Sequence, residues 1–375
     1  MAKLSKIGKI TLGSILLFTI VVTVLECLVI YFHVSLVSDF TLDEHGKGIS
    51  TADLIYHSIF LFSLLFQILL VADALHYRNT IQIVALVIFN LLSLAYAGIQ
   101  LYQHKILEDE GLDKAEWNPK NRGKFTSPED TKKYFEKRIR PLEYTIIGLV
   151  TMYFNIFTFL SYKLMTEFGW ENYKTYSADV KIRNAYVELT ILQTLIKMDV
   201  FFVLSYAVQL IPSHQIGYPN WMFETVLICV LGPVMLLLAW WAATKEQKYA
   251  VLVVINILFL SEGYLLYRLV RVNIKRDPDP YRFTRRFLSF FLATTFVLVA
   301  ITIVYAIICF RNMMRGTYVL TVFGIDDVSV PPGDAYTLFE DQQPNSPTSP
   351  RKSNRMSQIE QNRLSKLNSP RILLD

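Results

Sequence analysis

Long apolar stretches dominate the chain, and the polar residues gather in the segments between them. A helix that crosses the hydrocarbon layer needs about 20 mostly apolar residues, because each residue adds only about 1.5 Å along its axis. Helix is the expected conformation, since lipid offers the backbone no hydrogen-bond partners. Eight stretches meet this requirement: roughly 10–33, 54–75, 80–102, 144–164, 190–211, 221–244, 249–270 and 287–310.

The pattern therefore predicts an all-α, polytopic transmembrane helix bundle with about eight spans over residues 1–316. A charged loop, residues 103–142, separates the third span from the fourth, and its part 129–140 is expected to form a short surface helix. From residue 317 onward the chain is expected to be a flexible tail. Pro, Ser, Asn, Gln and Arg dominate there after Pro331, a composition typical of disordered segments.

The connections at 76–79 and 245–248 are so short that the spans they join must be antiparallel neighbours. The second and third spans therefore form one predicted pair, and the sixth and seventh spans form another.

Composition supports the same class of protein. Of the 375 residues, 53% are hydrophobic and 18% charged, whereas soluble domains carry roughly a quarter charged residues. These values exclude a soluble enzyme and a disordered protein, and they make the lipid bilayer the expected partner. The basic residues flank the spans, and we interpret them as membrane anchors rather than as a nucleic-acid site.

No cofactor, metal site or disulfide framework is predicted. The three cysteines lie inside apolar runs, and no Cys/His group has zinc-site spacing. His33, His57 and His214 have no carboxylate or cysteine at a supporting position and are interpreted as structural. Because no nucleophile–base pattern or nucleotide loop is present either, no catalytic residue is assigned and the chain is not expected to be an enzyme.

Two observations disagree about the orientation in the membrane. The side that holds the termini carries eleven Lys and Arg residues and the opposite side seventeen, which favours termini that face away from the cytosol. The tail favours cytosolic termini, because Tyr336 and Phe339 have the spacing of an adaptor sorting signal, which would bind cytosolic adaptor or coat proteins as an extended peptide. Five tail serines are candidate phosphorylation sites: Ser346, Ser349, Ser353, Ser357 and Ser369. We favour cytosolic termini, but the orientation is open.

Ionisable residues within the spans form the main candidate site. A charge near the middle of a span costs about 2.5–3.5 kcal/mol on insertion scales, so each needs a reason to be there. The candidates are Glu26, Asp73, Lys197, Asp199 and Glu262. They either line a cavity or ion path, or form a latch between helices. For Lys197 the expected partner is Glu262 or Glu26, because opposite charges lower each other's burial cost.

One part of the chain resembles an uncharacterised fungal family of multi-pass Golgi apparatus membrane proteins. The resemblance depends on residues 168–174 (FGWENYK), 177–179 (SAD) and 195–202 (LIKMDVFF), with Ser177 and Met198 where the family has Gly and Phe. It implies a Golgi membrane location and no known activity.

The first of these motifs also has a physical interpretation. It follows the fourth span, where aromatic rings anchor at the headgroups and charged residues stay in water. The interfacial residues predicted from it are Trp170, Tyr173, Lys174 and Asp179.

Three functions fit these observations. The chain is an integral Golgi or endomembrane protein that acts by interaction in membrane trafficking or organisation, with the tail as its docking segment. Alternatively, it transports a small solute or ion with the buried charges of spans one, five and seven. A seven-span-like receptor is the third possibility, and it requires that the fifth apolar stretch does not cross the membrane.

Overall fold

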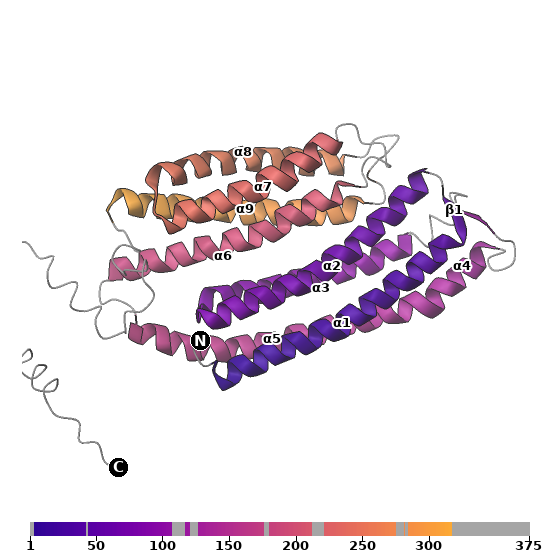
Figure 1. Cartoon of the computed structure of the whole chain (residues 1–375), viewed down its shortest axis with the longest axis horizontal. Coiled ribbons are helices and arrows are strands. Elements are labelled where there is room, and N and C mark those ends of the chain that lie inside the picture. The colour runs from indigo at the N-terminus through magenta and orange to yellow at the C-terminus, as the bar shows by residue number, and fades with distance from the viewer. Residues whose placement is uncertain are drawn as a thin grey trace, which may run out of the picture. The chain divides into compact units, whose positions relative to one another are not determined.

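In the computed structural model the apolar stretches form a bundle of long helices (Figure 1). The structure describes residues 4–42, 44–106, 117–120, 127–175, 180–211, 221–274, 281 and 284–316. The long helices are α1 (Lys6–Ser38), α2 (Glu44–His76), α3 (Thr80–Ile106), α5 (Arg140–Thr175), α6 (Val180–Gln209), α7 (Trp221–Thr244), α8 (Lys248–Asn273) and α9 (Arg285–Met314). The predicted tail, residues 317–375, lies outside the described residues.

Eight helices of the described part are long and apolar enough to cross a membrane, which confirms the predicted fold class. These stretches are Lys6–Ser38, Ser50–His76, Thr80–Tyr102, Glu129–Gly169, Lys181–Gln209, Glu224–Thr244, Lys248–Asn273 and Arg285–Met314.

The outer faces of these helices are apolar. Leu17, Leu69 and Leu260 are each more than 60% exposed. In water each such side chain would lose about 25 cal/mol of stabilisation for every Å² left uncovered, whereas lipid covers it without loss. The bundle therefore presents a surface suited to the lipid bilayer.

The helices pack as two groups of four. We call α1, α2, α3 and α5 the N-terminal group, and α6, α7, α8 and α9 the C-terminal group; Figure 1 shows them one above the other. Each helix packs mainly within its own group, and α2 and α3 meet α6 and α9 where the groups join.

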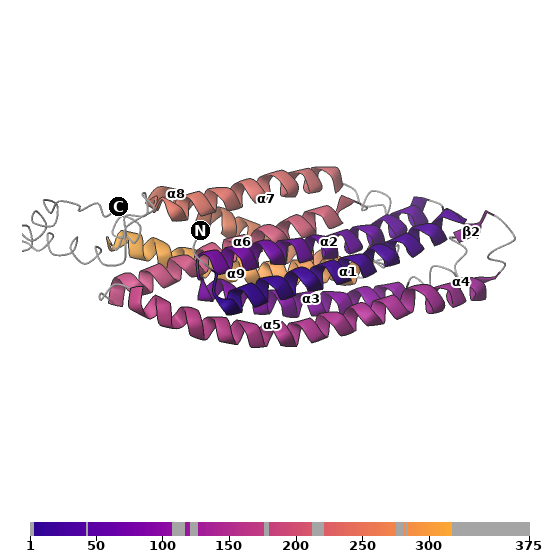
Figure 2. The same ribbon diagram turned by 60° about the horizontal axis from the view of Figure 1, so that its bottom comes forward.

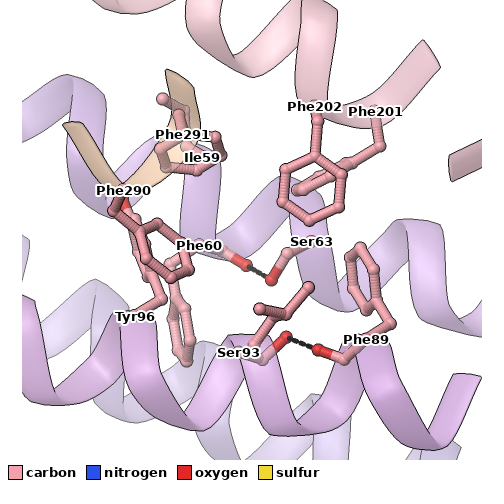
Figure 3. Close-up of a pocket in the computed structure, with 11 residues that line it drawn as sticks. Ile59, Phe60, Ser63, Phe89, Ser93, Tyr96, Phe201, Phe202, Phe290 and Phe291 are labelled. Carbon is pink, nitrogen blue, oxygen red and sulfur yellow. Dashed lines mark hydrogen bonds between the residues drawn. The ribbon is translucent and has the colours of Figure 1, made fainter. Parts of the chain in front are cut away.

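Aromatic rings fill the junction between the groups (Figure 3). Phe89 of α3 lies with its ring centroid 4.9 Å from that of Phe201 of α6, and Tyr96 lies 5.6 Å from Phe291 of α9. The cavity left among these rings is about 20 Å³, which is room for about one water molecule. Its two serines donate to carbonyls of their own helices, Ser63 to Phe60 and Ser93 to Phe89. We call this junction the aromatic seam.

The charged loop is more regular than its composition predicts. The expected surface helix is present as α4 (Pro128–Tyr134) and a π-helical turn, η2 (Phe135–Ile139), but it continues directly into α5 (Figure 2). Ser127 and Asp130 form a capping box that starts α4. Two short strands, β1 (Phe40–Leu42) and β2 (Trp117–Pro119), pair antiparallel and tie the loop to the α1–α2 connection.

The short connections behave as predicted, since α2 packs on α3 and α7 packs on α8. In the first turn the Asn79 side chain accepts hydrogen bonds from the backbone N–H groups of Ile81 and Gln82, at 3.0 and 3.2 Å. It thereby caps the start of α3.

Candidate functional site

Six ionisable side chains are buried together at one end of the N-terminal group. None of them is more than 6% exposed. They are Glu26 and His33 from α1, Asp53 and His57 from α2, His104 from α3, and Glu143 from α5. We call this set the histidine–carboxylate cluster.

The helix directions bring these residues together. α1 and α3 run toward this end of the bundle and α2 and α5 leave it, so the last turns of one pair face the first turns of the other. Asp53 and His57 are four residues apart and share one face of α2. Glu26 and His33 are seven apart and share one face of α1.

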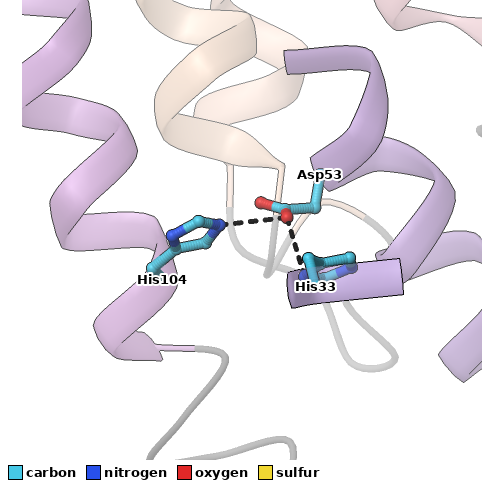
Figure 4. Close-up of side chains that lie close together, drawn as sticks. All are labelled: His33, Asp53 and His104. Atoms are coloured by element: carbon cyan, nitrogen blue, oxygen red, sulfur yellow. Dashed lines mark hydrogen bonds and ion pairs between the residues drawn. The ribbon is translucent and has the colours of Figure 1, made fainter. Parts of the chain in front are cut away.

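Asp53 lies at the centre of the cluster. Its Oδ2 atom is 3.0 Å from Nε2 of His104, 3.3 Å from Nδ1 of His33 and 3.7 Å from Nε2 of His57. Figure 4 shows this carboxylate between the rings of His33 and His104. The Nε2 atoms of His57 and His104 are 3.3 Å apart.

The outward ring nitrogens of the histidines also have partners. Nδ1 of His57 is 2.6 Å from Oε2 of Glu26 and 2.5 Å from the amide nitrogen of Gln100, and Nδ1 of His104 contacts Glu143. Nε2 of His33 is 3.2 Å from the hydroxyl of Ser50. Arg140 contacts the second oxygen of Glu143 at 3.3 Å. Each ring therefore has a polar partner outside Asp53, while Nδ1 of His33 has, among the described residues, only the carboxylate of Asp53 nearby, at 3.3 Å and without a hydrogen bond.

Such a cluster can store protons, bind a metal ion, or stabilise the packing of the helices through its hydrogen bonds. His33, Asp53 and His104 each offer a ligand atom, and these atoms all lie within 4.8 Å of one another. Spacing along the chain does not reveal this group, because its members lie on three helices. The interpretation of His33 and His57 as histidines without a supporting carboxylate is wrong, since Asp53 and Glu26 contact them. The available signals were the four-residue spacing of Asp53 and His57 and the recurrence of His and Asp near the ends of neighbouring apolar stretches.

The five predicted intramembrane residues do not form one cluster. Glu26 belongs to the histidine–carboxylate cluster, where it contacts His57. The predicted pairing of Lys197 with Glu262 or Glu26 is wrong, because Lys197 contacts Asp73 of α2 instead, with Nζ 2.5 Å from Oδ2. The orientation of α6 about its own axis determines the partner, because it places Lys197 on the face of α6 that packs against the N-terminal group.

The Lys197–Asp73 bridge connects the two helix groups. Gln82 of α3 supports it, accepting from Lys197 at 3.0 Å and donating to Asp73 at 2.8 Å. The ammonium also lies 5.2 Å from the ring centre of Trp240 on α7. The Lys197 and Asp73 side chains are 25% and 31% exposed, so the bridge is only partly screened from its surroundings.

Asp199 and Glu262 lie in the C-terminal group. Asp199 is fully buried; its Oδ2 accepts from the hydroxyl of Thr302 at 2.6 Å, and its Oδ1 has no hydrogen-bond partner among the described residues. Glu262 of α8 is close enough to interact electrostatically with Asp199. The fully buried Asp199 and the partly exposed Glu262 thus lie near each other in this group.

The remaining predicted residues are not tested by the structure. Trp170, Tyr173 and Lys174 belong to the last turns of α5, and their side chains are not described. Several lie outside the described residues: Asp179, Tyr336, Phe339, Ser346, Ser349, Ser353, Ser357 and Ser369.

Eight membrane-length helices with apolar outer faces and buried ionisable clusters define a polytopic helical membrane protein. The chain is 23% identical over 320 residues to a UPF0658 Golgi apparatus membrane protein of Schizosaccharomyces pombe, which covers 82% of this chain and 89% of the relative. This confirms the predicted resemblance to a fungal family of Golgi membrane proteins, and it supports the Golgi membrane as the location. No protein-family model and no solved structure matches the chain.

Proposed function

We propose that this Golgi membrane protein transports a small inorganic cation, and that the Lys197–Asp73 bridge controls the movement of its two helix groups. The observation that carries the proposal is the bridge itself, which places opposite charges from α6 and α2 at the junction between the groups. Many transporters work by rocking one helix group against another around a site at the junction.

The energetics favour a functional role over a structural one. The Lys197 and Asp73 side chains are 25% and 31% exposed, and an ion pair with that access to its surroundings contributes only about 0–1 kcal/mol, so it is not needed merely to hold the helices together. The aromatic seam already packs the groups. Lys197 lies within its span, where a charge carries an insertion cost of about 2.5–3.5 kcal/mol at the helix centre, and a transport site would explain why this cost is tolerated.

The proposed mechanism is a competition between cations for one carboxylate. A cation that binds Asp73 displaces the Lys197 ammonium, which can turn toward the nearby Trp240 ring and be stabilised there by a cation–π interaction. Loss of the bridge frees the groups to rock about the aromatic seam. Asp199 and Glu262 offer further carboxylate oxygens to a cation or proton inside the C-terminal group.

Reconstituted vesicles test this proposal. We expect Lys197→Met and Asp199→Asn to abolish cation flux while the protein still inserts normally, with proton flux followed by a trapped pH dye and Zn²⁺ and Mn²⁺ uptake measured separately. Lys163→Met is the matched control, because Lys163 is exposed on α5 and its loss should leave flux unchanged. Wild-type vesicles that move none of these cations, or variants that lose only abundance, would contradict transport.

Trafficking by interaction is a second candidate, supported by the sorting-type spacing of Tyr336 and Phe339. We expect Tyr336→Ala to redistribute a fluorescent fusion away from the Golgi, with Tyr318→Ala as a control tyrosine outside that motif. An unchanged steady-state distribution would count against this role. A seven-span receptor has no support from the eight candidate spans, which include the fifth.

A further inference from the structure

The histidine–carboxylate cluster has no part in the transport proposed above. An ionised carboxylate only accepts, so Glu26 and Glu143 favour the tautomers of His57 and His104 that carry hydrogen on Nδ1, while the amide nitrogen of Gln100 also lies 2.5 Å from Nδ1 of His57. In a neutral imidazole the opposite nitrogen then has a free lone pair. The Nε2 lone pairs of His57 and His104 are then directed at each other and at the Asp53 carboxylate, which is repulsive unless a proton or a metal ion lies between them.

The spacing of these atoms suits a bound metal ion. Tetrahedral nitrogen or oxygen ligands at about 2.0–2.1 Å from a zinc ion are about 3.3 Å apart. Measured from Asp53 Oδ2, the three ring nitrogens lie at 3.0, 3.3 and 3.7 Å, and the two Nε2 atoms are 3.3 Å apart. These four separations match the spacing of ligands around a tetrahedral ion, and the ligand atoms of His33, Asp53 and His104 all lie within 4.8 Å of one another.

The surroundings of the donors are those of a metal site. Histidine ligands almost always donate their second nitrogen to a carboxylate, carbonyl or water, which fixes the tautomer and ring direction. Here Glu26, Glu143 and Ser50 occupy those positions. Independently, Asp53 Oδ1 and His33 Nδ1 are buried without a hydrogen-bond partner among the described residues.

Charge balance leads to the same conclusion. With neutral histidines, Glu26, Asp53 and Glu143 bring three negative charges into a site where each is at most 6% exposed, and Arg140 offsets one of them. Buried charges need partners or metal ions. A divalent cation would neutralise the two that remain. Imidazole-rich donor sets suit zinc and its transition-metal neighbours, whereas magnesium and calcium prefer oxygen alone.

We propose that His33, Asp53, His57 and His104 bind a divalent transition-metal ion of the zinc class inside the N-terminal group. Glu26, Glu143 and Ser50 position the histidine rings for it. The site lies on α1, α2 and α3, with Glu143 added from α5, and it does not depend on the Lys197–Asp73 bridge or on transport.

The test is metal binding by the full-length protein, purified in detergent with a tag that contains no histidine. We expect about one equivalent of Zn²⁺ by elemental analysis, and a visible absorption band of tetrahedral Co²⁺ after exchange. Asp53→Asn and His104→Asn should lose both signals. Glu262→Gln removes another membrane carboxylate and should keep them, as should Lys197→Met even if it loses flux.

Two further measurements cover variants that fail to fold. His104→Cys retains a ligand and should add a thiolate-to-Co²⁺ charge-transfer band, and Zn²⁺ should raise the unfolding temperature of the wild-type protein. A wild-type protein that binds no more Zn²⁺ than Asp53→Asn, shows no tetrahedral Co²⁺ band and gains no stability from Zn²⁺ would overturn the proposal. In that case protons on the histidines balance the carboxylates.

Discussion

The Glu143 carboxylate lies behind the proposed metal ligand His104 rather than in contact with the ion. Glu143→Gln keeps an oxygen that can accept from Nδ1 of His104, but it removes the negative charge that makes the ring a better donor. We expect Zn²⁺ affinity to fall by about 10- to 100-fold, measured by competition with a chromophoric chelator. Glu129→Gln, an exposed change on α4, is the control and should leave affinity unchanged. Equal affinities for both variants would mean that Glu143 does not support a metal ligand.

For individual residues, the sequence predicts which ones are unusual better than it predicts which residues they contact. Lys197 and Asp199 stand out in an apolar stretch, and the structure does give both polar contacts. The partner of Lys197 could not be predicted, because the rotation of each helix about its axis depends on packing that one sequence does not reveal. The Lys197 ammonium contacts Asp73, which is near the end of its span, and not the deeper carboxylates Glu26 and Glu262.

At the scale of elements, apolar length predicts the long helices because membranes impose that length. The boundaries at the water-facing ends are less predictable. Pro128–Tyr134 forms a helix as expected, yet it continues through a π-helical turn into α5. The strand pair Phe40–Leu42 and Trp117–Pro119 was not predicted, because three residues are too few to show alternation.

The histidine–carboxylate cluster also depends on how the helices are arranged in space. His33 and His104 are far apart along the chain, and each alone fits a structural histidine in a helix. Only the alternating helix directions place the end of α1 and the end of α3 beside the start of α2, where Asp53 lies. A metal site built from several helices therefore leaves little trace in sequence spacing, unlike the short loops of zinc-binding motifs.

For the whole molecule, the sequence predicts eight spans and a Golgi membrane location, but it does not predict that the helices separate into two groups. The groups meet through the ring pairs Phe89–Phe201 and Tyr96–Phe291 and through the Lys197–Asp73 bridge. Aromatic residues are spread over the whole chain, so their positions in the sequence do not indicate which of them meet at this junction.

The bridge gives the sharpest distinction between a latch and a transport element. Removing one partner, as in Lys197→Met or Asp73→Asn, leaves a charge without its counterpart, and for this partly exposed pair we expect a loss of roughly 1–2 kcal/mol of stability. The double variant leaves no unpaired charge and should recover most of that stability, measured as the unfolding temperature in detergent. If the bridge serves transport, the double variant should fold well and still show no cation flux, because Asp73 no longer attracts the cation. Recovery of flux together with stability would instead make the bridge a structural latch.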